Sequence, residues 1–257
     1  MTASYRISLR HRRNTVFLWI GEAGGVMNTV LRQEKKYLIN LSEFARYDHY
    51  LAQLLQPDLN NGGQGYRVRS LYFDTLDEDD YQERQDGVEI RCKIRLRFYT
   101  PSDQTIKLEI KQKQGNQQLK RSLIVSRQDA IRFSQADYSP LLRYADPLAA
   151  ELYAVMNMRC YRPKAIVEYR RKAYLAKEAE TRITFDHSIQ ATESNLDFFS
   201  ENLNLYPVFD SYNVILEVKY NNFLLSYLKE MLQQVNRSEL SVSKYSLSRS
   251  IGLHYLF

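Results

Sequence analysis

The sequence predicts an α+β fold in which a closed antiparallel β-barrel surrounds a charged interior and helices cover its outer side. Two observations lead to this prediction. Several segments alternate charged and apolar residues with the period of two that is typical of a strand, and others repeat apolar residues with helical spacing. If the charged side of the strands faces inward, the apolar side is free to pack against the helices.

The first strand is expected over Leu31–Ile39, where alternate residues are charged. Ser42 is the expected cap of a helix that runs to about Leu55. The apolar residues of this helix form one stripe: Phe44, Tyr47, Leu51, Leu54 and Leu55. A turn is predicted over Asn60–Gly65, followed by a strand over Tyr66–Thr75.

Two basic strands follow, over Ile90–Phe98 and Lys107–Lys113. Between residues 84 and 121, ten Lys and Arg stand against four Asp and Glu, an excess as large as the formal charge of +6 of the whole chain. An antiparallel sheet with one face in water also produces alternation. A solvated face, however, normally mixes charges of both signs, so a recurring Arg-rich face favours a polyanionic ligand.

Local signals mark the next helices. Ser126–Asp129 resembles a capping box, and Asp146 is a cap followed by Pro147 at the first helical position. The second of these helices has its apolar stripe at Leu148, Leu152, Val155 and Met156. A last stretch of helical spacing covers residues 224–235.

Three strands lie among these helices, over Lys164–Leu175, Thr181–Ile189 and Val214–Tyr220. In the second, Arg182 and Asp186 share a face, and in the third Glu217 and Lys219 do so. An open sheet would leave these groups in water. A closed barrel would instead gather them in a basic interior with a few carboxylates.

Composition limits the choice of partner and location. A chain of 257 residues without linkers or repeats is compatible with one domain, and a pI near 9.1 fits phosphate, nucleic acid or an acidic membrane as ligand. Two cysteines are too few for a disulfide framework, so we expect reduced thiols and a cytoplasmic location. No segment approaches the roughly 18 apolar residues that span a bilayer.

The folded domain is expected over residues 31–257. Residues 1–30 precede the first strand and are interpreted as an extension, which either follows from a misplaced start ahead of Met27 or is a flexible tail. The apolar run Thr15–Gly21 after a basic segment has only the features of a weak signal peptide.

Eight short motifs occur in a specific order along the chain: Glu34-Lys35-Lys36-Tyr37, Ser70-Leu71-Tyr72-Phe73-Asp74-Thr75, Ile94-Arg95-Leu96-Arg97-Phe98-Tyr99, Leu108-Glu109-Ile110-Lys111, Tyr169-Arg170-Arg171-Lys172-Ala173-Tyr174, Arg182-Ile183-Thr184-Phe185-Asp186, Leu216-Glu217-Val218-Lys219 and Ser243-Lys244-Tyr245. In these motifs the chain resembles the VTC-type polyphosphate polymerase domain, within the triphosphate tunnel fold shared with CYTH enzymes. The resemblance extends from Leu31 to the C-terminus and implies transfer of the terminal phosphate of ATP to inorganic polyphosphate.

The resemblance also implies roles for individual residues. The phosphate ligands would be Lys36, Arg95, Arg97, Lys111, Arg171, Arg182 and Lys244, and those expected to act in catalysis are Arg95, Arg97, Lys111, Arg171 and Arg182. Glu217 matches the ligand of a divalent metal, Mn²⁺ or Mg²⁺, and Glu109 is a second candidate. Glu34 and Lys219 are further candidates for this site.

One departure separates the chain from hydrolytic CYTH relatives, which have Glu-x-Glu-x-Lys on the first strand. Here the segment is Arg32-Gln33-Glu34-Lys35-Lys36, with arginine at the position of one glutamate. This difference favours polyphosphate synthesis over triphosphate hydrolysis, which is the alternative function.

A third class is a non-catalytic module that binds polyphosphate or RNA. The chain has twenty tyrosines, which could stack on nucleic acid bases. Carboxylates recur among the cations, however, and favour metal–phosphate chemistry, so nucleic acid is not the expected partner. The sequence identifies no protein partner. No Gly-rich phosphate loop or serine-nucleophile motif is present, and the four histidines have no metal-site spacing.

Overall fold

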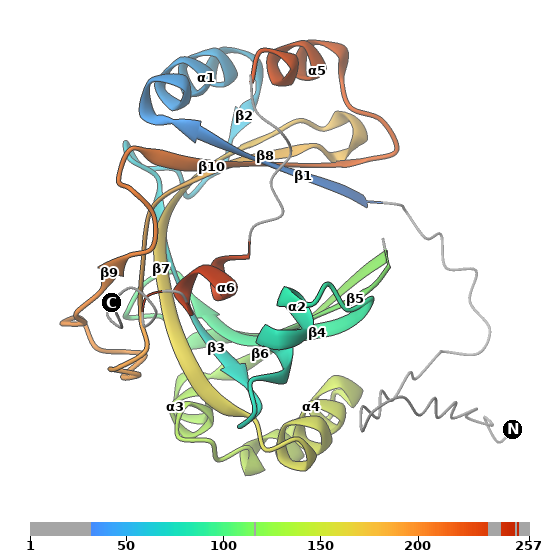
Figure 1. Ribbon diagram of the computed structural model, residues 1–257, viewed down its shortest axis with the longest axis vertical. Helices are drawn as coiled ribbons and strands as arrows, with labels where there is room; N and C mark the ends of the chain where they lie inside the picture. The colour runs from blue at the N-terminus through green and yellow to red at the C-terminus, as the bar shows by residue number, and fades with distance from the viewer. Residues whose placement is uncertain (1–31, 116, 236–242, 250, 252–257) are drawn as a thin grey trace, which may run out of the picture. The chain divides into compact units, whose positions relative to one another are not determined.

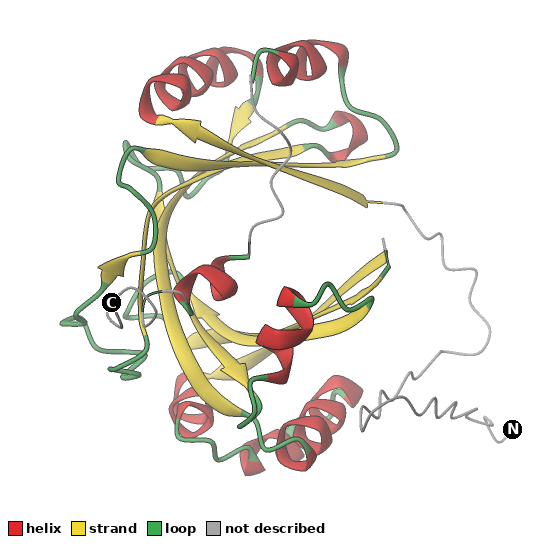
Figure 2. Ribbon diagram, in the orientation of Figure 1, coloured by secondary structure: helices red, strands yellow, loops and turns green. Residues whose placement is uncertain are grey.

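A computed structural model describes residues 32–115, 117–235, 243–249 and 251. The predicted extension over residues 1–30 lies outside this range. The described residues form one antiparallel sheet with helices on both of its sides (Figures 1 and 2). Its strands are β1 (Arg32–Asn40), β2 (Gln56–Pro57), β3 (Tyr66–Asp74), β4 (Ile90–Phe98), β5 (Thr105–Gln114), β6 (Gln117–Ser126), β7 (Arg162–Leu175), β8 (Arg182–Thr192), β9 (Tyr206–Pro207) and β10 (Asn213–Asn221).

The helices are short and connect these strands. They are α1 (Leu41–Leu54), α2 (Asp79–Gln85), α3 (Arg127–Ser134), α4 (Pro147–Met158), α5 (Ser226–Gln233) and α6 (Lys244–Ser248), with 3₁₀ turns η1 (Ser139–Arg143) and η2 (Glu178–Glu180). Among the described residues, no helix is long and apolar enough to cross a membrane.

The sheet is strongly curved but it is not a closed barrel, so the prediction of closure is wrong. The strand order is β1-β10-β8-β7-β3-β4-β5-β6, and the two end strands exchange no backbone hydrogen bonds over the described residues. Closure needs a backbone ladder with a fixed stagger between the end strands. Near these ends an ion pair lies on the concave side instead, because Lys111 Nζ of β5 meets Glu34 Oε2 of β1 at 3.3 Å.

The predicted separation of charged and apolar faces is confirmed. In β4 the residues that alternate with the cations are Cys92, Ile94, Leu96 and Phe98, and all four are buried. On the convex side, α1 and α5 pack against β10, β8 and the end of β7 through one apolar cluster that includes Leu51, Phe185 and Leu228. Helices α3 and α4 lie at the other end of the sheet (Figure 1).

Most predicted boundaries agree with the structure to within a few residues, with one correction at α1. The cap of α1 is Asn40 rather than Ser42, because Asn40 Oδ1 accepts from Glu43 N while Glu43 Oε2 accepts from Asn40 N, both at 2.8 Å. The predicted caps Ser126 and Asp146 are confirmed, since each side chain accepts from a backbone N–H in the first helical turn.

The helices α2 and α6 and the strand β6 were not predicted, nor were the two-residue strands β2 and β9 and the 3₁₀ turns η1 and η2. The two helices span only seven and five residues, and β6 lacks strict alternation. Helix α6 lies inside the curve of the sheet (Figure 1), where its residue Tyr245 is buried among side chains of the concave face. This position brings the C-terminal part of the chain next to the basic strands.

The predicted turn before β3 depends on one glycine. Gly65 has φ of +79°, and a Cβ atom at this position would lie 2.3 Å from the carbonyl oxygen of Arg171. Only a residue without a side chain fits so close to a neighbouring backbone. The glycine therefore allows the turn to pack against β7 at the residue that carries a predicted site arginine.

Candidate functional site

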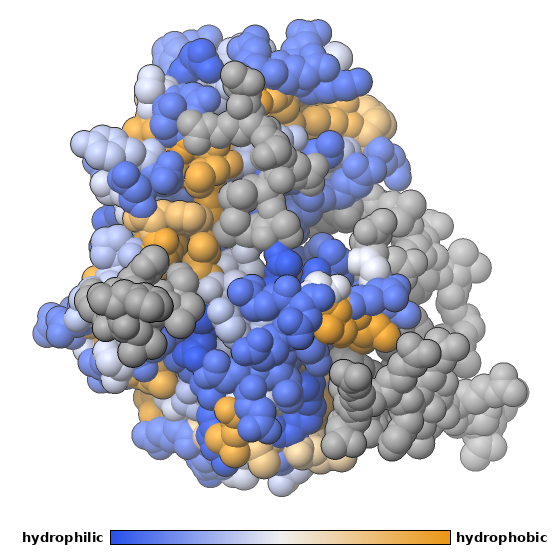
Figure 3. Space-filling model, in the orientation of Figure 1, coloured by the Kyte–Doolittle hydropathy of each residue, from blue (hydrophilic) through white to orange (hydrophobic). Residues whose placement is uncertain are grey.

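Cations from seven strands and α6 share the concave face of the sheet. Strand register assigns most of them to this face, and we call the set the cationic face: Lys36, Lys93, Arg95, Arg97, Lys107, Lys111, Lys120, Arg171, Arg182, Lys219 and Lys244. All seven predicted phosphate ligands belong to it. Hydrophilic side chains also gather over α2 and the region beside it in the middle of Figure 3.

Glu109 lies at the centre of the β4–β5–β6 part of this face and is only 2% exposed. Its Oε2 atom accepts from Arg95 Nε at 2.7 Å and lies 3.7 Å from Arg97 Nη1, and its Oε1 atom lies 2.5 Å from Lys120 Nζ. Burial alone would raise the pKa of Glu109, but the three cations outweigh burial and lower the pKa. Glu109 therefore holds three cations of this face in place.

A second buried carboxylate, Asp186 of β8, is fully enclosed. Arg171 donates to both of its oxygens, at 2.6 and 2.7 Å, and Lys244 Nζ lies 2.6 Å from Oδ2. Burial tends to raise the pKa of Asp186, but Arg171 and Lys244 lower it to about 2. The carboxylate thus brings together two predicted phosphate ligands that are far apart in sequence.

Glu34 of β1 and Glu217 of β10 form the third cluster, together with the lysines opposite them in the register. Lys36 Nζ lies 2.5 Å from Glu34 and 3.7 Å from Glu217, and Lys219 pairs with Glu217 and lies 4.0 Å from Glu34. Burial opposes ionisation of both carboxyls, but these lysines lower the pKa of Glu34 to about 2 and that of Glu217 well below its ordinary value. Both groups are anionic at neutral pH.

Arg182 has side-chain partners outside these three clusters. Its Nη2 donates to Asp58 Oδ2 at 2.9 Å and to Tyr66 Oη at 3.1 Å, and a third of the side chain is exposed. It shares the face with the other predicted ligands and is more open to solvent than Arg171.

Lys93 is a half-buried member of the cationic face that the predicted set of ligands omits, although the alternation of β4 places it beside Arg95. Its Nζ donates to Ser243 Oγ at 2.5 Å and lies 5.9 Å from the ring centre of Tyr245. Burial, followed by repulsion from Arg84, lowers the pKa of Lys93 to about 7. Partial loss of this charge at neutral pH makes Lys93 a group that an arriving anion can recharge.

Aromatic rings form the floor beneath several of the cations. Arg171 and Lys244 lie 5.3 and 4.8 Å from the ring centre of Tyr169, and Arg95 lies 5.7 Å from that of Tyr72. The two tyrosines are 2% and 5% exposed. Rings covered in this way cannot stack on nucleic acid bases, which argues against the RNA-binding alternative for this face.

The described residues could supply only part of the ligand set of a divalent cation. No group of three or more His, Cys, Asp or Glu side chains with metal-binding geometry occurs in the described part of the chain. Mg²⁺ commonly uses one or two carboxylates and completes its shell with water and substrate phosphates. Glu217 with Glu34 meets that requirement, whereas the neighbours of Glu109 are all cations.

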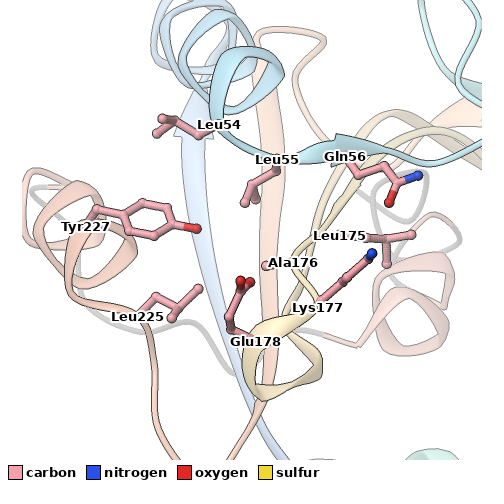
Figure 4. Close-up of a pocket in the computed structure, with 9 residues that line it drawn as sticks. All are labelled: Leu54, Leu55, Gln56, Leu175, Ala176, Lys177, Glu178, Leu225 and Tyr227. Carbon is pink, nitrogen blue, oxygen red and sulfur yellow. The ribbon is translucent and has the colours of Figure 1, made fainter.

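Two surface hollows are lined by residues outside the cationic face. One of about 360 Å³ lies between α1, α5 and the turn after β7, and its lining is mainly apolar (Figure 4): Leu54, Leu55, Gln56, Leu175, Ala176, Lys177, Glu178, Leu225 and Tyr227. The other, of about 390 Å³, is lined by Arg67, Glu168, Tyr169, Arg170, Ser188 and Gln190. Neither contains a member of the cationic face.

Solved structures of other proteins align with this chain at low sequence identity. A crystal structure described as a "putative adenylate cyclase" from Bacillus halodurans aligns with TM-score 0.49 and 13% identity, over 82% of this chain and 95% of that one. A protein with the same description from Vibrio parahaemolyticus aligns with TM-score 0.46 and 13% identity, over 84% and 96%. None of the curated proteins matches the sequence.

The sequence itself matches the profile of the VTC domain over residues 31–251. This range includes every strand of the sheet and every member of the cationic face. The chain belongs to the VTC domain family.

Proposed function

We propose that the protein is a metal-dependent polyphosphate polymerase, which transfers the terminal phosphate of ATP to a growing inorganic polyphosphate chain. The observation that carries the proposal is the cationic face, in which cations outnumber the carboxylates Glu34, Glu109, Asp186 and Glu217. Membership in the VTC domain family supports the same chemistry. We also propose a cytoplasmic location, which two free cysteines fit.

Phosphoryl transfer makes few covalent demands on a protein, because the main requirements are in-line positioning and neutralisation of charge. Arg95 and Arg97 project from one strand and Arg171 from another, and their guanidinium groups are suited to bind phosphate oxygens in pairs. Glu109 and Asp186 hold these groups in place before the ligand arrives. A rigid cationic face thus reduces the reorganisation needed at the transferring phosphate.

The lysines on either side of Glu34 and Glu217 have a different task in this scheme. Lys36, Lys111 and Lys219 share these two carboxylates, and each can exchange a carboxylate oxygen for a phosphate oxygen. The exchange leaves Glu217, with Glu34, as the ligand pair for Mn²⁺ or Mg²⁺. When bound, such an ion would offset the negative charge of the phosphates.

The test is incubation of the full chain with ATP and Mn²⁺ or Mg²⁺, followed by gel detection of polymer and measurement of ADP. We expect long polyphosphate with stoichiometric ADP, and loss of both products on Arg97→Ala. Arg121→Ala is a matched control, because Arg121 pairs with Glu151 of α4 outside the cationic face. Binding of polyphosphate without turnover under either metal would refute the polymerase and support a non-catalytic module.

Triphosphate hydrolysis remains the second candidate because Glu34 stays close to Glu217 through shared lysines. The pair retains a two-carboxylate metal site even though Arg32 replaces one glutamate of the hydrolytic signature. Release of free phosphate from tripolyphosphate, with no polymer from ATP, would favour this function.

A further inference from the structure

Tyr245 is a buried contact of helix α6 on the concave side of the sheet. Tyr245 is almost fully buried, and its ring stacks on Tyr72 with centroids 5.2 Å apart and planes 23° apart. The ring also meets Tyr81 of α2 edge-on, at 6.4 Å and 84°. The hydroxyl of Tyr245 donates to Asp74 Oδ2 at 2.6 Å. Tyr245 is thus held by contacts of its ring with two other tyrosines and by one hydrogen bond to Asp74.

The anchor, Asp74, ends β3 and is fully buried. Its Oδ1 accepts from the backbone N–H groups of Thr75 and Asp80 at 2.8 and 2.9 Å, and its Oδ2 accepts from that of Tyr81 at 3.0 Å. One carboxylate therefore fastens the end of β3, the first turn of α2 and, through Tyr245, α6. Burial raises the pKa of Asp74, and the hydrogen bonds from Tyr245 and these backbone groups counter part of the rise.

Helix α6 contributes its first residue, Lys244, to the cationic face. Lys244 Nζ reaches Asp186 at 2.6 Å and lies over the ring of Tyr169, and the cap residue Ser243 accepts from Lys93 Nζ at 2.5 Å. A helix of five residues has no stability of its own in water. Its position must therefore come from tertiary contacts. The Asp74–Tyr245 hydrogen bond is buried, and at the other end of the helix Arg249 pairs with Glu78 and Glu193.

We propose that Asp74 is a positioning residue for the phosphate site. Through its hydrogen bond to Tyr245 it holds α6 so that Lys244 lies in the cationic face beside Arg171, ready to bind a phosphate group. The role of Lys244 rests on the proposed function, whereas the anchoring of α6 does not. Neither Asp74 nor Tyr245 touches the ligand in this scheme.

A contribution to stability alone would have different consequences. If Asp74 and Tyr245 only stabilise the fold, loss of their hydrogen bond lowers the melting temperature without changing the affinity of the folded protein. If they position Lys244, the loss of affinity depends on Lys244 being present. A double-mutant cycle between Tyr245 and Lys244 separates these cases.

The variant is Tyr245→Phe, which removes the hydroxyl and keeps the stacked ring. Tyr138→Phe is the matched control, because Tyr138 is equally buried and its hydroxyl donates to Tyr161 O at 2.8 Å, outside the site. Hydrogen exchange of the free, full-length protein is measured over residues 243–249. We expect faster exchange in this segment for Tyr245→Phe and no change there for Tyr138→Phe.

The second measurement is calorimetric titration with inorganic tripolyphosphate. Lys244→Ala should weaken binding about tenfold or more, and Tyr245→Phe about three- to tenfold, as expected for loss of a charged hydrogen bond and for partial loss of its positioning. The double variant should bind no more weakly than Lys244→Ala alone. Tyr138→Phe should bind like the wild type.

Unchanged exchange over residues 243–249 in Tyr245→Phe would overturn the anchoring of α6. Faster exchange combined with independent, multiplying losses of affinity would overturn the positioning of Lys244. If the wild-type protein does not bind tripolyphosphate, the proposed function fails, and the exchange measurement then decides whether Asp74 holds α6.

Discussion

Replacement of Glu217 by glutamine separates metal binding from anion binding. Glu217 is 5% exposed and pairs with Lys219 and, at 3.7 Å, with Lys36. The amide keeps the shape but removes the negative charge. Because the cationic face becomes more positive, tripolyphosphate should bind at least as tightly as to the wild type when no divalent metal is present. Turnover that depends on Mn²⁺ or Mg²⁺ should fall sharply.

The loss of stability depends on which carboxylates remain near Lys36 and Lys219 in the variant. Removing one partner of an isolated buried ion pair costs about 3–5 kcal/mol. Here Glu34 remains 2.5 Å from Lys36 and 4.0 Å from Lys219, so neither ammonium loses every carboxylate. We therefore expect about 1–3 kcal/mol, typical of losing a charged hydrogen-bond partner. The melting temperature should fall by roughly 2–4 °C for each kcal/mol.

The assay combines calorimetric titration of tripolyphosphate in chelator with polymer synthesis at saturating metal, below the melting temperature of the variant. Glu151→Gln is the matched control, since Glu151 is a buried carboxylate that pairs with Arg121 outside the cationic face. It should lose similar stability and keep full turnover. The reasoning is refuted if Glu217→Gln binds tripolyphosphate more weakly than the wild type and retains metal-dependent synthesis.

Three other outcomes are expected. Arg97→Ala should weaken tripolyphosphate binding by about 1.5–3 kcal/mol, measured by calorimetry, because a buried charged donor is lost; an unchanged affinity would remove Arg97 from the site. Lys93 has a folded pKa of about 7 against an ordinary 10.5, so the unfolded chain binds more protons between these values. Stability should rise with pH through that window, and Lys93→Met should flatten the rise in a series of denaturant titrations; an identical slope would contradict the assignment. Gly65→Ala should cost about 1–3 kcal/mol and shift Arg171, because its Cβ would collide with the Arg171 carbonyl; an unaltered urea midpoint would show that the turn adapts.

Local patterns in the sequence were sufficient for most of the secondary structure and for the division of the sheet into two faces. β4 occupies the predicted Ile90–Phe98, and Ser126 and Asp146 cap helices as expected. These features depend on residues close in sequence, whose spacing sets the direction of side chains and the pairing of helix N–H groups. The resemblance to the VTC domain likewise depended on short motifs, and the family match confirms it.

The open sheet and the partners of each charge were decided by tertiary structure. Whether β1 and β6 exchange backbone hydrogen bonds depends on accumulated twist and stagger over all the strands between them, which periodicity does not encode. Asp186 obtains Arg171 from β7 and Lys244 from α6, and Glu109 of β5 is surrounded by cations from its two neighbouring strands, β4 and β6. Sequence alone determined that cations line one face, because alternation is local. Only folding determined which carboxylate holds which cation, because these contacts join residues that are far apart in sequence, such as Lys36 and Glu217.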